Sequence, residues 1–197
     1  DLAELLIEIH PWAKSARFTR AGGESMAIAV RIARAFTGRD KVALCGYHGW
    51  HDWYLAANLG AEGNSLGSHL LPGLDPNGVP NKLGGSALTF HYNRLDELDA
   101  VIAEHGKDLG AIVMEPIRYT DPDPGFLEGV RERCNQLGIP LIFDEISCGW
   151  RGCLGGAHLR LGVEPDIAVF AKALGNGFPI GAIVGRDDVM QAAQSSF

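Results

Sequence analysis

Residues 166–182 read DIAVFAKALGNGFPIGA and decide the fold. The apolar run 167–170 is typical of a buried strand, and it delivers Lys172 to a glycine-rich turn. A second apolar run, residues 140–145 (PLIFDE), carries Asp144 near its end. Lys172 and Asp144 are 28 residues apart (172 − 144), about the length of one strand–helix–strand step. A lysine and a carboxylate that follow two buried strands indicate a site at the edge of a sheet.

The alternation of apolar runs and helical spacing extends over the whole chain. Strands are predicted at residues 16–20, 41–46, 87–90, 109–114, 141–144, 167–170 and 180–184. Helices are predicted at residues 2–9, 24–37, 95–104 and 126–137, with a short one around Leu159 and another beginning at the C-terminus. Residues 21–23 predict a tight turn. Residues 60–85 predict a long loop, which in a compact domain is usually functional or ordered by a partner.

These elements predict an α/β fold. Strands that are apolar throughout and alternate with helices indicate a mostly parallel sheet of about seven strands with helices on both faces. The strand at residues 180–184 starts only ten residues after residue 170, too close for a crossover helix, so it is expected to run antiparallel. A length of 197 residues fits one domain, residues 1–197.

Ligands of such sheets bind outside the C-terminal ends of the strands. The candidate site residues follow these ends and are Gly22, Gly23, Tyr47, His48, Glu115, Asp144 and Lys172.

Composition bounds the partners and the compartment. The chain has a net charge of −7 and no basic cluster, so no nucleic-acid partner is expected. No apolar run approaches the roughly 20 residues that span a bilayer, so no membrane partner is expected. The four cysteines form no CxxC pair, which is typical of reduced thiols and predicts a cytoplasmic protein. Both ends of the sequence fall inside or beside helical patterns, so we expect a fragment of a longer chain.

Two segments each allow more than one interpretation. Gly22 and Gly23 precede a predicted helix, whose unpaired N–H groups suit a phosphate, but a plain strand-to-helix turn explains them as well. Residues 47–54 (YHGWHDWY) are dense in aromatic side chains. They are consistent with core packing, with stacking on a flat ring, or with a metal site built from His48, His51 and Asp52.

The two polar strand ends are also ambiguous when each is taken alone. Asp144 either pairs with a cation or protonated ring nitrogen, or caps a turn. Lys172 either serves as a partly buried nucleophile or base, or extends its amine to solvent. In combination, an amine nucleophile, an acid for a ring nitrogen, an aromatic side chain for a ring face and a phosphate-binding turn describe pyridoxal phosphate.

Longer motifs support the same cofactor. They are residues 17–25 (RFTRAGGES), 31–39 (RIARAFTGR), 47–49 (YHG), 144–151 (DEISCGWR) and 172–182 (KALGNGFPIGA). On these motifs, over essentially all 197 residues, the chain resembles the class III aminotransferases of pyridoxal-phosphate fold type I. Within that family it is most similar to the glutamate-1-semialdehyde aminomutase-like group.

The resemblance implies roles for individual residues. Lys172 is expected to form the Schiff base with the cofactor and to move protons as a general acid and base. Asp144 is expected to keep the ring nitrogen protonated, and Tyr47 and Ile146 to sandwich the ring. Backbone amides near the glycines at positions 22 and 23 are expected to hold the phosphate. His48, within the ring-stacking motif, and Glu115, beside Asp144, are expected to line the site.

The resemblance also implies an activity. We expect amino-group transfer, as an aminotransferase or a 2,1-aminomutase, between a small-molecule amine or amino acid and a keto or aldehyde substrate. The full-length parent is expected to be a homodimer. Because relatives carry an N-terminal segment and a C-terminal small domain in addition, the 197-residue piece alone is expected to be a poor catalyst.

Three positions depart from the family pattern, and two alternative functions remain. Ala21 and Gly23 stand where hydroxyl residues are common, so the phosphate loses side-chain hydrogen bonds. Ser147 stands where many relatives carry Gln near the cofactor's phenolic oxygen, which bears on substrate type.

The first alternative function is a non-catalytic, truncated cofactor-binding fragment. The second is a metallohydrolase that uses His48, His51 and Asp52, or else Cys148, Cys153 and His158.

Overall fold

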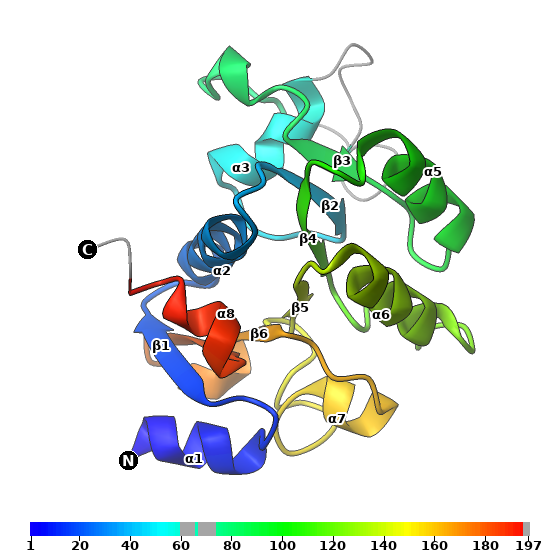
Figure 1. The fold of residues 1–197 in the computed structure, drawn as a ribbon. Helices are drawn as coiled ribbons and strands as arrows, with labels where there is room; N and C mark the ends of the chain where they lie inside the picture. Colours follow the sequence, from blue (N-terminus) through cyan, green and yellow to red (C-terminus); the bar gives the residue numbers. More distant parts are fainter. Residues whose placement is uncertain (60–65, 67–73, 195–197) are drawn as a thin grey trace.

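The computed structural model describes residues 1–59, 66 and 74–194 and contains a sheet of seven strands with helices on both faces (Figure 1). The strands are β1 (Ser15–Thr19), β2 (Lys41–Cys45), β3 (Ala87–Thr89), β4 (Leu109–Met114), β5 (Leu141–Asp144), β6 (Ile167–Phe170) and β7 (Gly181–Gly185). The helices are α1 (Leu2–Ile9), α2 (Gly22–Thr37), α3 (Asp52–Leu55), α5 (Leu95–His105), α6 (Phe126–Leu137), α7 (Ala157–Leu161) and α8 (Asp187–Gln191). Short 3₁₀ turns are η1 (Ala56–Leu59), η2 (Asn81–Leu83) and η3 (Lys172–Gly175). Among the described residues, no helix has the length and apolar character to cross a membrane.

The strand order is β1-β7-β6-β5-β4-β2-β3. Strands β6, β5, β4, β2 and β3 pair in parallel, and β7 pairs antiparallel with both β6 and β1. The predicted α/β fold with a mostly parallel sheet is therefore confirmed, and so is the antiparallel direction of β7. Since β1 is antiparallel to β7, it points the same way as β6.

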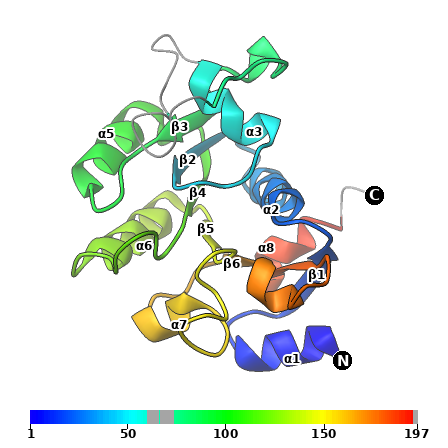
Figure 2. The same cartoon turned by 180° about the vertical axis from the view of Figure 1, so that it is seen from behind.

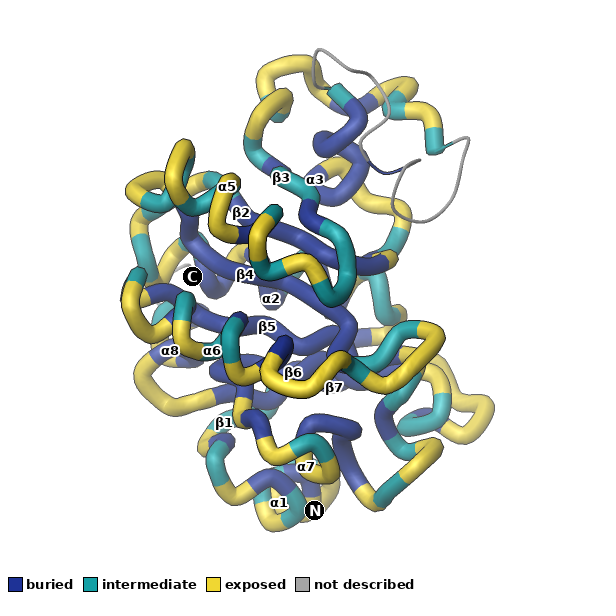
Figure 3. Tube along the Cα trace, turned by 90° about the vertical axis from the view of Figure 1, so that its right-hand side faces the viewer, coloured by how far each residue is buried: buried dark blue, intermediate teal, exposed yellow. Residues whose placement is uncertain are grey.

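Alternation along each strand divides the core between the two faces of the sheet. Val42, Val113 and Ile142 face one side and belong to the cluster that includes α2, α3 and α8. Their neighbours Ala43 and Phe143 face the other side, where α5 and α6 cover them (Figure 2). Because both faces are covered, the central strands are buried at almost every position (Figure 3). This two-sided burial explains why the strands are apolar throughout.

Helix α2 supplies one wall of the site. Met26, Val30 and Ala33 repeat at helical spacing and are buried against the sheet. The helix ends at Gly38, which adopts a left-handed φ of 65° and donates its N–H to the Arg34 carbonyl at 2.8 Å. This is a common helix stop, because glycine enters the left-handed region without steric cost.

Local predictions differ from the structure in three places. The tight turn predicted at residues 21–23 is wrong beyond Ala21, because α2 already begins at Gly22 and both glycines lie in its first turn. Helix α3 and the following turn η1 lie in a segment for which no element was predicted. Within the predicted loop 60–85, residues 60–65 and 67–73 lie outside the described part, and residues 81–83 form η2.

Candidate active site

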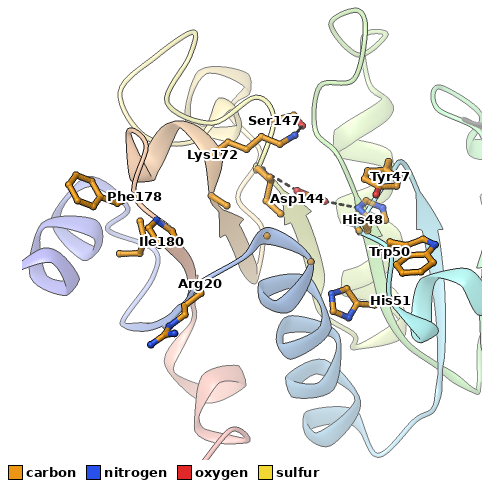
Figure 4. A pocket seen from close by; sticks show the side chains of 16 residues that line it. Arg20, Tyr47, His48, Trp50, His51, Asp144, Ser147, Lys172, Phe178 and Ile180 are labelled. Carbon is orange, nitrogen blue, oxygen red and sulfur yellow. Dashed lines mark hydrogen bonds and ion pairs between the residues drawn. The ribbon is translucent and has the colours of Figure 1, made fainter.

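The carboxyl ends of β2, β4, β5 and β6 lie at one edge of the sheet, together with the end of β1. Loops at this edge enclose a cavity of about 430 Å³. Its wall includes seven of the eight residues predicted for the site: Gly22, Gly23, Tyr47, His48, Asp144, Ile146 and Lys172. The topology thus brings together residues that lie at or just beyond the ends of four strands (Figure 4). Their contacts with a cofactor remain predictions.

Lys172 lies directly beyond β6 and opens the turn η3. Its Nζ donates a hydrogen bond to Ser147 Oγ at 2.8 Å, so the exposed amine is held against the cavity wall (Figure 4). The backbone of Lys172 has a φ of 47°, in the left-handed region that side chains other than glycine disfavour. Such strain costs about 1–3 kcal/mol and is often found at functional residues.

Asp144 is buried at the end of β5, and both of its carboxylate oxygens have partners. Oδ1 accepts the backbone N–H of Ile146 at 3.0 Å, while Oδ2 lies 2.9 Å from Nδ1 of His48. The first contact is the turn cap that the sequence allowed, and the second is a side-chain pair. The carboxylate is therefore fixed in orientation where it lines the cavity.

The aromatic segment after β2 packs into the core, which is one of the interpretations that its sequence allowed, and stacking on a flat ring stays a prediction. His48, Trp53 and Tyr54 are buried, and the His48 and Trp53 rings stack with centroids 6.1 Å apart. The Tyr54 hydroxyl donates to the Gly46 carbonyl at 3.0 Å and thereby fixes the start of the loop. Tyr47 is partly exposed and lines the cavity, where its ring is free to stack on a planar ligand.

The first turn of α2 packs so closely against neighbouring side chains that only glycine fits at positions 22 and 23. A Cβ at Gly22 would lie 2.9 Å from Cδ1 of Ile146, and one at Gly23 would lie 2.7 Å from the His51 ring. The N-cap Ala21 makes no side-chain hydrogen bond. The first N–H groups of a helix lack partners within the helix. Those of α2 are thus available at the cavity wall, where a helix N-terminus favours an anion.

Glu115 does not line the cavity, in contrast to the prediction that it lies in the site beside Asp144. Its carboxylate accepts the backbone N–H of Tyr47 at 3.0 Å and forms an ion pair with Arg118. The residue after β4 thus supports the loop that carries Tyr47 and does not contribute to the wall of the cavity. Sequence alone did not distinguish Glu115, which lies outside the cavity, from Asp144, which lines it, because both residues lie at the end of a strand.

A second buried network lies behind Asp144. The fully buried Glu145 accepts from the backbone N–H and Nδ1 of His158 at 2.9 and 2.8 Å, from the Ala157 N–H at 2.9 Å, and from the Cys148 thiol at 3.0 Å. Nε2 of His158 accepts from the Trp12 indole at 3.0 Å, so Nδ1 is the ring nitrogen that donates to Glu145. Burial alone would raise the pKa of Glu145. The hydrogen bonds from His158 and Cys148 outweigh burial and hold that pKa below its ordinary value.

Sequence reasoning did not assign several residues of the wall to the cofactor site, and it named His51 only as a candidate metal ligand. The unassigned residues are Arg20, Trp50, His51, Phe178, Pro179 and Ile180. Trp50 and Phe178 are exposed large apolar side chains on opposite sides of the group (Figure 4). The signal that could have identified all six is position. Arg20, Trp50 and His51 lie at or shortly after the C-terminal end of a predicted strand. The other three lie at the start of the strand predicted at residues 180–184, which runs antiparallel and so begins at the same edge.

The metal-binding interpretation lacks its ligand set in the described part of the chain. No three His, Cys, Asp or Glu side chains gather there as they would around a metal ion. Nδ1 of His48 pairs with Asp144 rather than with Asp52. Cys148 donates to Glu145 and Cys153 donates to the Gly156 carbonyl.

Comparison with known proteins identifies the family. The pattern described as "Aminotransferase class-III" matches residues 1–196. The chain belongs to the class III aminotransferases. It is 39% identical over 196 residues to a 3-aminobutyryl-CoA aminotransferase from Cloacimonas acidaminovorans (strain Evry), which covers 96% of this chain and 43% of the relative.

Solved structures agree in fold. A transaminase with pyridoxal phosphate bound is 31% identical with a TM-score of 0.83, covering 95% of this chain and 44% of that one. A glutamate-1-semialdehyde aminomutase from Pseudomonas aeruginosa PAO1 is 26% identical with a TM-score of 0.78, covering 98% of this chain and 42% of that one. The predicted family is confirmed, and an aminomutase is among the similar proteins. The chain spans less than half the length of each of these three relatives.

Proposed function

We propose that residues 1–197 form the cofactor-binding large domain of a pyridoxal-phosphate-dependent enzyme that transfers an amino group as an aminotransferase or a 2,1-aminomutase. The substrates are a small-molecule amine or amino acid and a keto or aldehyde compound. The observation that carries the proposal is the shared cavity of Lys172 and Asp144, whose wall includes the N-terminus of a 16-residue helix. Family membership supports the same cofactor and the same chemistry.

The residues present fit this cofactor. The cavity of about 430 Å³ lies within the usual range for small-ligand sites. Gly22 and Gly23 let the first turn of α2 approach Ile146 and His51 closely, which places the N–H groups of the helix end at the cavity wall and suits the phosphate. Asp144 is a buried carboxylate whose charge suits a protonated ring nitrogen. Tyr47 and Ile146 would take the two ring faces.

When bound, the cofactor supplies an electron sink that stabilises negative charge on a substrate carbon. The chain's own residues set up this chemistry. Asp144, fixed by His48 and the Ile146 N–H, would hold a positive charge at the ring nitrogen. The Nζ of Lys172 is the group that carries a proton to and from the reacting carbon, and the Ser147 hydroxyl orients that amine.

Three further properties belong to the same proposal. We infer a homodimer for the full-length parent and a cytoplasmic location; all four cysteines are free, which agrees with a reducing compartment. We also infer that turnover requires the rest of the parent chain, because this chain covers only 43% of its 3-aminobutyryl-CoA aminotransferase relative.

Reductive trapping tests the proposal. The purified chain is mixed with stoichiometric pyridoxal phosphate, treated with borohydride, digested and analysed by mass spectrometry. We expect one modified site, Lys172. Lys172→Ala should lose the adduct, while Lys82→Ala, a matched change at an exposed lysine of η2, should keep it. A wild-type chain without an adduct, or equal labelling of the two variants, would contradict the proposal.

A further inference from the structure

The turn that would hold the phosphate has no side-chain donor of its own. Residues 21–23 are Ala, Gly and Gly, and Ala21 makes no side-chain cap hydrogen bond. The backbone of Arg20, just before the turn, donates to Glu24 at 2.9 Å, and its side chain extends away from Lys172 (Figure 4). The turn alone therefore offers an anion only the N–H groups of the helix end.

The space that a side chain at position 23 would fill is occupied by His51. An ideal Cβ on Gly23 would lie 2.7 Å from both Cδ2 and Nε2 of that imidazole. Gly23 and His51 both line the cavity, and the ring lies beside the first turn of α2 (Figure 4). The edge of the imidazole that carries Nε2 thus lies against the space that a side chain on residue 23 would enter.

The fold holds the backbone of His51 in this place. Its carbonyl accepts the N–H groups of Tyr54 and Leu55, both at 3.0 Å, and so anchors it to the buried helix α3. Gly49 has a φ of 94°, and a Cβ on it would approach Cα of Gly23 to 2.8 Å. The loop after β2 and the first turn of α2 therefore meet backbone to backbone. His51 is exposed, and its ring makes no hydrogen bond to another residue in the part of the chain that the structure describes. An imidazole carries at least one N–H in either protonation state.

We propose that His51 donates a side-chain hydrogen bond to the phosphate of the cofactor and takes the place of a hydroxyl side chain at position 23. The inference rests on the proposed function. His51, which is 28 positions further along the chain than Gly23 (51 − 23), would supply the side-chain hydrogen bond that residues 21–23 lack. Its ring would also explain why residue 23 is glycine.

Two ligands and three variants test the inference. Dissociation constants for pyridoxal phosphate and for pyridoxal, which lacks the phosphate, are measured by absorbance titration of the full chain. His51→Ala should weaken binding of pyridoxal phosphate about tenfold, the effect of one hydrogen bond to a charged group, and leave binding of pyridoxal unchanged. Gly23→Ser should also weaken binding of pyridoxal phosphate, because the new side chain collides with the imidazole. The double variant Gly23→Ser/His51→Ala should recover most of the wild-type affinity, since the hydroxyl then has room to donate.

Each other outcome counts against the inference. If His51→Ala binds pyridoxal phosphate as tightly as wild type, or weakens both ligands equally, His51 is not a phosphate donor. If the double variant loses as much as the two single changes together, the exchange of side chains is wrong. If the wild-type chain binds neither ligand at Lys172, the proposed function fails and this inference fails with it. Wild-type binding without an effect of His51 removes the inference alone.

Discussion

Replacing Glu145 by Gln should destabilise the folded chain strongly, although the two side chains have the same shape. The carboxylate of Glu145 is fully buried, and its two oxygens accept from four donors. An amide has one oxygen and one NH₂ group, so in either orientation the NH₂ faces two of these donors. Glu145→Gln thus leaves without an acceptor either the two buried N–H groups of His158, or the buried Ala157 N–H and the partly buried Cys148 thiol.

The magnitude follows from the count of lost partners. An unsatisfied buried donor costs about 1–3 kcal/mol, so two cost about 2–6 kcal/mol. The loss is a large share of the roughly 5–15 kcal/mol that stabilises a typical domain. Glu132→Gln is the matched control, because Glu132 is exposed and accepts a single hydrogen bond from Gln136 on the same helix. This control should change stability by no more than about 0.5 kcal/mol.

Urea denaturation followed by circular dichroism measures both variants. We expect a much lower midpoint for Glu145→Gln at an unchanged slope, and a midpoint near wild type for Glu132→Gln. A Glu145→Gln chain within about 1 kcal/mol of wild type would refute the reasoning, because it would show that the four contacts contribute little beyond their packing.

Three further predictions concern the same region. The pKa of Glu145 is lower in the folded chain than its ordinary value of 4.5. The ionised carboxylate therefore stabilises the fold fully above pH 4.5, and this stabilisation is lost as the pH falls through the folded pKa. As the pH is lowered, the urea midpoint should drop less in Glu145→Gln than in wild type. Lys172→Gly should unfold at higher urea than Lys172→Ala, by about 0.5–1 kcal/mol, since glycine removes the strain of φ 47° at some cost in chain entropy; equal midpoints would show that the backbone there is unstrained. His48→Leu should lower stability by about 1–3 kcal/mol in the same assay, because Oδ2 of Asp144 loses its donor; an unchanged midpoint would mean that solvent replaces the histidine.

The sequence predicted the parts of the molecule that follow from periodicity. The bounds of β4, β5, β6 and α6 were predicted to the residue, because buried strands and an amphipathic helix have patterns that no neighbour needs to complete. The short helix α3 was not predicted, since four residues are too few to show a helical period. It exists because Trp53 and Tyr54 are buried by other parts of the chain.

The candidate site likewise contains positions that the sequence could predict and positions that it could not. The places of Lys172 and Asp144 in the cavity wall were predictable, because each residue follows or ends an apolar run. Glu115 satisfied the same rule, yet it supports the Tyr47 backbone from outside the cavity. Which way a side chain at a strand end turns depends on its neighbours in space. The contact of His51 with Gly23 could not be predicted either, because it joins the loop after β2 to the first turn of α2, and their close approach depends on the glycines at 23 and 49.

The adjacent carboxylates of Asp144 and Glu145 show how one strand end serves both the site and the scaffold. Consecutive residues of an extended chain point in opposite directions. Asp144 therefore reaches the cavity and His48, and Glu145 reaches the network of His158 and Trp12 on the other side. The Glu145 network ties the loop that carries Ile146 and Ser147 to α7 and to the segment after α1. Because Ser147 in turn accepts the Lys172 amine, the position of the proposed catalytic lysine depends on a buried carboxylate that does not line the cavity.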